Sequence, residues 1–320
     1  MNDILLLNPV LKEKIWGGSK LKEHFGYEIS SDQTGECWGI SGHGNGTNTV
    51  VNGQFKGKSV RQLWENHREL FDNEEGDEFP LLVKIIDAQD DLSVQVHPDD
   101  QYAKEHEGYA FGKTECWYIL DSEPGAELVL GHSANSREEL KQQVNEKKWD
   151  ELFRRVSVKA GDFVYVPSGT VHAIGSGVLL LEIQQSSDIT YRFYDYDRPG
   201  QDGKMRELHI DDSIACSMVP HEDAKLDRPL WKEEGLVVEQ LIKEDYFTVH
   251  KWTLEKNLGS LKRSNTSYQL VSVIDGAGQI QTEESVHLVK KGDHFIIPSG
   301  VNHYELTGDL VLVVSETTKN

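Results

Sequence analysis

Four side chains in the first half of the sequence could together hold a metal ion. Gln95 and His97 are two residues apart in the strand-like run 92–98, and the period of a β-strand turns both toward one face. Glu115 shares a strand face with apolar residues, so its carboxylate needs a buried partner. His172 follows a Pro-Ser-Gly turn that gives it a rigid direction. Such nitrogen and oxygen ligands suit Zn²⁺, and equally Fe²⁺, Mn²⁺ or Co²⁺.

The sequence contains an internal repeat, and only its first copy carries these four residues. The segment 161–172 recurs as 292–303, and both copies contain Gly-Asp, an apolar run, Pro-Ser-Gly and a final histidine. Two such distant copies predict two versions of one domain rather than a solenoid. In the second copy Gln269 stands where Glu115 would be, and the segment 262–267 offers no histidine pair. We therefore expect a metal ion in the first copy alone, with His303 kept for structure.

The elements that must position these residues are mainly short strands. Alternating or β-branched runs occupy residues 81–87, 92–97, 115–121, 178–185, 190–194, 246–254 and 310–315. Helical patterns are few, at residues 99–107, around 136–153 and after Asp211. The matching turns of the two copies resemble the second conserved motif of the cupin superfamily. This resemblance implies two antiparallel β-barrel, or jelly-roll, domains with a ligand or metal in the barrel mouth.

The predicted domain division follows from the repeat. We expect an N-terminal catalytic cupin domain over residues 1–204, with the metal site and a small helical insertion at about 136–153. A connecting segment is expected over 205–235, and a degenerate cupin domain without metal over 236–320.

Longer stretches of the chain resemble type I phosphomannose isomerases, in their short bacterial form. The stretches are Gln-Val-His-Pro at 95–98, Lys-Thr-Glu at 113–115, the turn at 167–172 and the run 182–192. The resemblance implies one Zn²⁺ per chain on Gln95, His97, Glu115 and His172, and an active-site arginine at Arg192. It also implies interconversion of mannose 6-phosphate and fructose 6-phosphate through an enediol(ate). Longer members carry a helical domain between Glu115 and His172 that this chain lacks.

Two cations are the predicted catalytic residues. Arg192 would stabilise the enediolate, and Lys113, on the strand face of Glu115, would contact the substrate. From composition alone, Arg192 could instead be paired with Asp195 and Lys113 could lie at the surface. The substrate phosphate requires a local basic cluster, whose candidates are Lys113, Arg192, Arg198, Lys204 and Arg206. Glu182 is either an inward partner of the site or a general base.

Composition excludes several classes of partner. The 33 basic and 54 acidic side chains give a net charge of −21, which repels nucleic acid and anionic membranes. The N-terminus carries no basic leader, and no apolar run reaches membrane-spanning length. Three cysteines at no metal-ligand spacing suit a reducing compartment. We expect a cytoplasmic protein that acts on a small sugar phosphate and uses no cofactor besides the metal; the sequence leaves its oligomeric state open.

Two other functions stay open at this point. A metal-dependent cupin oxygenase would use iron with coordination positions left for O₂, and the Gln and Glu ligands argue against it. A non-catalytic sugar-binding bicupin would keep the fold and the metal while Arg192 and Lys113 only hold a ligand.

Overall fold

The computed structural model describes residues 3–200, 203–233, 235–254, 258–262 and 267–318 of the 320-residue chain. Its architecture is mainly β, as the alternating runs predict, and the paired strands run antiparallel in three sheets. The six-stranded sheet has the order β10 (Phe163–Val166), β7 (Glu115–Ser122), β12 (Val178–Gln185), β5 (Leu81–Ala88), β3 (Thr34–Ser41) and β2 (Val10–Gly18). The five-stranded sheet has the order β13 (Tyr191–Tyr194), β6 (Val94–Val96), β11 (His172–Ile174), β8 (Glu127–His132) and β9 (Phe153–Ser157).

The ten-stranded sheet contains most of the second half of the chain. Its main path is β14 (Leu230–Glu233), β15 (Leu236–Lys243), β16 (Phe247–Leu254), β21 (His303–Thr317), β18 (Gln269–Gln281), β20 (His294–Ile297), β1 (Leu5–Asn8) and β4 (Thr49–Val50). Two further strands lie off this path: β17 (Leu258–Lys262) pairs with β21, and β19 (Val286–Lys290) pairs with β18.

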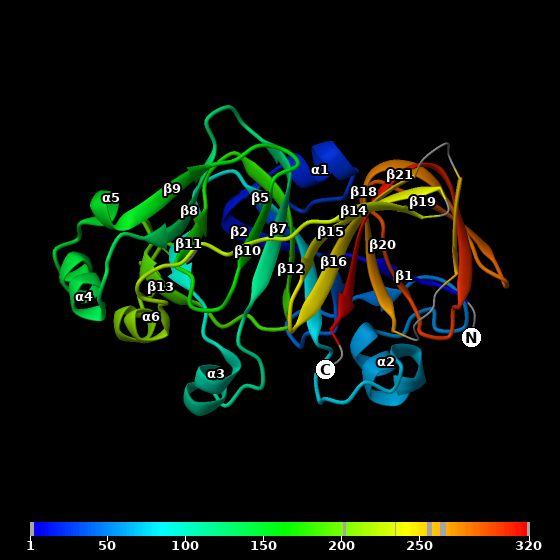
Figure 1. Cartoon of the computed structure of the whole chain (residues 1–320), viewed down its shortest axis with the longest axis horizontal. Helices are drawn as coiled ribbons and strands as arrows, with labels where there is room; N and C mark the ends of the chain where they lie inside the picture. Colours follow the sequence, from blue (N-terminus) through cyan, green and yellow to red (C-terminus); the bar gives the residue numbers. More distant parts are fainter. Residues whose placement is uncertain (1–2, 201–202, 234, 255–257, 263–266, 319–320) are drawn as a thin grey trace.

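The sheets stack in layers because each buries an apolar face. The inner faces of the six- and five-stranded sheets meet at residues such as Trp117, Leu128 and Ile174. The outer face of the six-stranded sheet packs on the ten-stranded sheet, where Ile85 and Leu270 share one core. Figure 1 shows this succession across the long axis of the molecule.

The helices are short and lie at the edges of this stack. They are α1 (Lys20–Phe25), α2 (Val60–Asn66), the 3₁₀ turn η1 (Arg68–Phe71), α3 (Asp100–His106), α4 (Arg137–Asn145), α5 (Trp149–Leu152) and α6 (Ile210–Cys216). The predicted helices near 99–107, 136–153 and 211 are confirmed as α3, as α4 with α5, and as α6. Ser136 caps α4 by accepting a hydrogen bond from the Glu139 N–H. Within the described ranges, no helix is long and apolar enough to cross a membrane.

The prediction that the sheets close into barrels is wrong. In the part of the chain that the structure describes, no sheet has its first and last strands paired with each other, so the sheets are open. The physical reason is the side-chain layer between the facing sheets: large residues such as Trp117 keep them roughly 10 Å apart, beyond the ~4.8 Å needed for strand pairing.

The repeat is visible in the strand register. Glu115 of β7 lies opposite Val166 of β10, and Gln269 of β18 lies opposite Ile297 of β20. The segment 262–267 of the second copy falls largely outside the described residues, at 263–266. The division into 1–204, 205–235 and 236–320 stays a prediction, and one strand crosses it, because Leu5 of β1 pairs with Ile296 of β20.

Candidate metal centre

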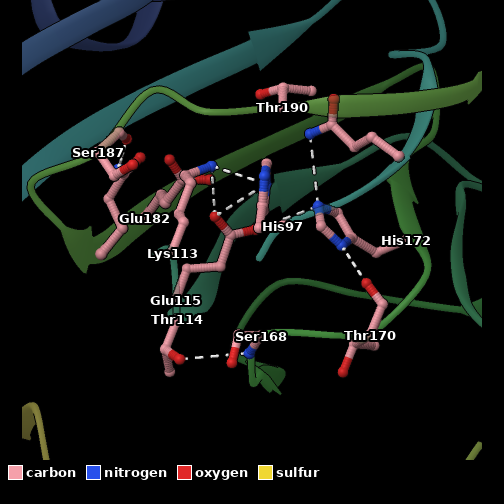
Figure 2. Close-up of polar contacts among 12 residues, drawn as sticks. His97, Lys113, Thr114, Glu115, Ser168, Thr170, His172, Glu182, Ser187 and Thr190 are labelled. Atoms are coloured by element: carbon pink, nitrogen blue, oxygen red, sulfur yellow. Dashed lines mark hydrogen bonds and ion pairs between the residues drawn. The ribbon is translucent and has the colours of Figure 1, made fainter. Parts of the chain in front are cut away.

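Three of the four predicted ligands converge between the facing sheets. One ligand atom from each of His97, Glu115 and His172 lies within 4.8 Å of the others. The His97 Nε2 atom is 3.7 Å from Glu115 Oε2, and the His172 Nε2 atom is 3.4 Å from Glu115 Oε1. The fourth residue, Gln95, places its amide nitrogen 3.4 Å from His172 Nε2. Figure 2 shows the two imidazoles on one side of the Glu115 carboxylate.

Strand pairing and one turn bring these residues together. His172 of β11 lies directly opposite Gln95 of β6 in the five-stranded sheet. The turn before β11 is fixed by the Gly169 N–H, which donates to the His97 carbonyl at 2.9 Å. Gly169 has φ +85°, a value that other residues rarely adopt. The turn is also tied to the strand of Glu115, since the Ser168 N–H donates to Thr114 Oγ1.

Backbone carbonyls orient both imidazoles toward the centre. The Nδ1–H of His97 donates to the Ile189 carbonyl at 2.7 Å, and that of His172 donates to the Thr170 carbonyl at 2.9 Å. The Nε2 atom of His172 therefore faces the Glu115 carboxylate, and that of His97 faces Glu115 and the Lys113 ammonium. Ligating histidines of protein metal sites are commonly held by a carbonyl in this way.

Burial keeps both histidines in the neutral form that binds metals. It lowers the pKa of His172 to about 4, and it lowers the pKa of His97 well below its usual range with help from Lys113. Burial and the nearby Glu182 raise the pKa of Glu115, against the opposing charge of Lys113. A carboxylate in this position is stabilised by additional positive charge.

The donor set fits a divalent cation. Glu115 is fully buried, and its Oε1 atom receives no hydrogen bond from any described residue. Such an atom is costly unless a partner satisfies it. Two neutral imidazole nitrogens, this carboxylate and the Gln95 amide form the mixed nitrogen and oxygen set that Zn²⁺ and neighbouring divalent metals accept.

Two lysines neutralise the carboxylates around the centre. The Lys113 Nζ atom is 2.6 Å from Glu115 Oε2 and 3.0 Å from His97 Nε2. The buried Lys84 Nζ atom is 2.9 Å from Glu182 Oε1, while Trp117 Nε1 donates to the other Glu182 oxygen at 3.1 Å. Burial alone would raise the pKa of Glu182, but the charges of Lys113 and Lys84 outweigh it and lower that pKa. Glu182 is thus an ionised carboxylate beside the centre.

A cavity of about 330 Å³ opens over these residues. Of the predicted cationic residues, Lys113, Arg192 and Arg206 line it, whereas Arg198 and Lys204 are not among its described lining residues. Arg192 lies opposite Gln95 in the β6–β13 register, and its buried Nε atom donates no hydrogen bond to a described residue. Arg206 is occupied by Asp195, with a 2.7 Å hydrogen bond from its Nε atom.

Sequence reasoning missed three lysines that also line the cavity. They are Lys12, Lys14 and Lys84. Lys84 carried a usable signal, because it interrupts the apolar run of β5, where an unpaired charge would be costly. Lys12 and Lys14 lie on an amphipathic edge strand, where lysines are usually solvated. The sequence around them therefore gave no sign that they line a cavity.

Comparison with known proteins gives matches over nearly the whole chain. A family model described as the catalytic domain of type I phosphomannose isomerase matches residues 4–118, and a model described as the cupin domain of mannose-6-phosphate isomerase matches residues 238–317. Mannose-6-phosphate isomerase ManA of Bacillus subtilis is 50% identical over 97% of this chain and 98% of its own length.

Two further relatives agree. The mannose-6-phosphate isomerase of Streptococcus mutans is 46% identical over the full length of both chains. A crystal structure of the mannose 6-phosphate isomerase from Bacillus subtilis superposes with a TM-score of 0.95 at 46% identity, covering 98% of this chain and 99% of that one.

Proposed function

This chain belongs to the type I phosphomannose isomerase family, and we propose that it interconverts mannose 6-phosphate and fructose 6-phosphate with one Zn²⁺ per chain. These matches confirm the resemblance that the sequence motifs indicated, and the family is one of enzymes. The observation that carries the proposal is the convergence of His97, Glu115 and His172 in a cavity that Lys113 and Arg192 also line.

Gln95, His97, Glu115 and His172 would hold the ion. When bound, it would supply a Lewis acid that polarises oxygen atoms of the substrate. The protein's contribution is the prior orientation of the ligands: carbonyl hydrogen bonds fix both imidazoles, and burial keeps them neutral. The imidazole rings then need not rotate when the metal binds, although the Lys113 ammonium has to withdraw from His97 Nε2 and Glu115 Oε2.

The reaction moves one proton between C2 and C1 of the sugar while negative charge develops on the attached oxygens. Arg192 supports the role of charge stabiliser because no described side chain forms an ion pair with it, so its guanidinium can donate to the substrate. The short contact of Lys113 with Glu115 supports a role in orienting a substrate oxygen beside the centre. Glu182 is held in place by Lys84 and Trp117.

The two alternative functions predict different behaviour. A cupin oxygenase would consume O₂ with loss of substrate, and the family membership of the chain argues against it. A non-catalytic sugar-binding bicupin would bind mannose 6-phosphate without forming fructose 6-phosphate. An arginine without an ion-pair partner would serve either function, so it is the membership of the chain in an isomerase family that favours turnover.

The decisive experiment is a coupled assay for fructose 6-phosphate formation from mannose 6-phosphate. We expect turnover in the metal-loaded protein, loss of turnover after chelation, and recovery on addition of Zn²⁺. Parallel reconstitution with Fe²⁺, Mn²⁺ and Co²⁺ identifies the preferred ion. Absence of turnover in protein shown to carry one metal ion per chain would overturn the isomerase proposal.

We also infer a cytoplasmic location. Cys37, Cys116 and Cys216 are free thiols, and the first two are buried, as suits a reducing compartment. Cell fractionation with a reporter fused at the C-terminus tests this inference.

A further inference from the structure

The cavity is locally cationic in a strongly acidic protein. Six basic and four acidic side chains line it, whereas the whole chain carries a net charge of −21. The basic residues are Lys12, Lys14, Lys84, Lys113, Arg192 and Arg206, and the acidic ones are Glu36, Glu115, Glu182 and Asp188. An anionic substrate repelled by the rest of the surface is attracted here.

Most of these cations are already committed to a carboxylate. Lys14 lies 3.1 Å from Glu36, and Lys84 lies 2.9 Å from Glu182. Lys113 and Arg206 are held by Glu115 and Asp195, as described above. Among the described residues, no carboxylate forms an ion pair with the two that remain, Lys12 and Arg192. Only these two can meet an added anion without first breaking an ion pair.

Lys12 and Arg192 line the cavity from different sheets. Arg192 lies opposite Gln95, beside the metal residues. Lys12 belongs to β2, the edge strand of the six-stranded sheet, whereas Glu115 belongs to β7, from which it is separated by β12, β5 and β3. Because Lys12 and the metal residues line one cavity from separate strands, a substrate whose C1 and C2 oxygens lie at the metal can direct its opposite end toward Lys12.

The ammonium group of Lys12 is held in place by two contacts, but not all of its hydrogen-bond donors are used. Its Nζ atom donates to the Asn45 carbonyl at 2.7 Å and lies 5.2 Å from the centre of the Trp38 ring. Asn45 is held in turn by Asp188, which also lines the cavity. An ammonium group has three donors, so further donors remain for phosphate oxygens.

We propose that Lys12 binds the phosphate group of the substrate and is the residue that makes the enzyme selective for phosphorylated over free sugar. The proposal rests on the proposed function and extends it to the end of the cavity remote from the metal. Lys12 acts in binding, because it lies away from the carbons between which the proton moves.

The test compares Lys12→Met, which keeps the aliphatic stem, with Lys12→Arg, which keeps the charge. Loss of a charged hydrogen bond to phosphate should raise KM for mannose 6-phosphate about 10- to 100-fold, with kcat changed less than about threefold. Lys12→Arg should restore most of the affinity. Lys58→Met, at an exposed lysine outside the cavity, is the matched control and should retain the wild-type KM.

Titration calorimetry with inorganic phosphate separates this inference from the proposed function. Wild type and Lys58→Met should bind phosphate with the same dissociation constant, and Lys12→Met should have a dissociation constant about 10- to 100-fold higher. This result is expected even if no isomerase activity is found. An unchanged KM and unchanged phosphate binding in Lys12→Met would overturn the inference while leaving the isomerase proposal intact. Thermal unfolding and metal content check that each variant is folded, and Lys12→Gln replaces Lys12→Met if that variant fails.

Discussion

The two copies of the internal repeat have the same strand register but treat one position in opposite ways. Glu115 lies opposite Val166, and Gln269 lies opposite Ile297 at the corresponding place. The Gln269 amide is satisfied within the protein, because its oxygen accepts from the Tyr304 hydroxyl at 2.8 Å and its nitrogen donates to Glu316 at 2.5 Å. Glu115 leaves Oε1 without a hydrogen bond from the described residues.

Buried histidines of the two copies show the same contrast. His172 uses one ring nitrogen for a backbone carbonyl and turns the other toward Glu115. His294 contacts a hydroxyl with each nitrogen, Ser272 at 2.8 Å and Tyr27 at 3.1 Å. A buried polar group whose hydrogen bonds are all made within the protein stabilises the fold. A buried polar group that lacks a hydrogen-bond partner is available to bind a ligand or metal.

The largest expected effect comes from making the first copy resemble the second. Glu115→Gln removes the carboxylate ligand, so the metal affinity should fall by more than about 100-fold and turnover by about 1,000-fold or more. Metal content after dialysis and the coupled assay measure both. His97→Ala should behave alike, and full metal retention in either variant would contradict the ligand assignment.

Arg192→Ala separates catalysis from metal binding. Without the Arg192 guanidinium to donate hydrogen bonds to the negative charge that develops on the substrate oxygens, kcat should fall about 10²- to 10³-fold. The metal content should stay at the wild-type level. Elemental analysis alongside steady-state kinetics checks the distinction. Equal loss of metal and activity would show that Arg192 is structural.

The converse change in the second copy should affect stability alone. Gln269→Glu places a carboxylate beside Glu316 in a buried site, which should lower the free energy of unfolding by about 3 kcal/mol. Urea unfolding measures this, with Gln269→Met as a control that removes the hydrogen bonds without adding charge. Isomerase activity at a temperature where the variant is folded should be unchanged; a loss larger than the folded fraction explains would break the comparison.

An effect that appears only at acidic pH concerns His294. Burial lowers the pKa of His294 from 6.5 to about 4, so the unfolded chain takes up this proton first as the pH falls. The stabilisation is complete above pH 6.5 and is lost toward pH 4, by on the order of 3 kcal/mol in all. Urea unfolding of His294→Gln should show a shallower decline between these values than wild type. Parallel curves would mean that His294 does not contribute.

Local periodicity predicted much of the site because its residues depend on strand faces. The two-residue spacing of Gln95 and His97 and the turn before His172 indicate how these side chains are directed, and the resemblance to type I phosphomannose isomerases joins them to Glu115. The charge of Lys84 in an apolar run indicates a buried partner, but neither Lys84 nor Lys12 could be assigned to this cavity, because their places follow from the lateral order of β2, β3, β5, β12 and β7. That order depends on pairings between residues far apart in the chain.

The same limit explains the errors in the fold. Alternation shows which strands have a buried face, but not whether a sheet closes, and the wide side-chain layer around Trp117 separates the facing sheets. The pairing of β1 with β20 left no local sign either, since Leu5–Asn8 is a short apolar run like others.

That pairing has a consequence for synthesis in the cell. β1 leaves the ribosome long before its partner β20, because Leu5 precedes Ile296 by 291 residues. The first half can begin to collapse during translation, but β1 and β4 join the ten-stranded sheet only after β20 has been synthesised. Until then β1 can pair with β4, but its other side, which faces β20 in the finished fold, has no partner strand. A stalled or truncated nascent chain without β20 therefore exposes a β-edge prone to aggregation.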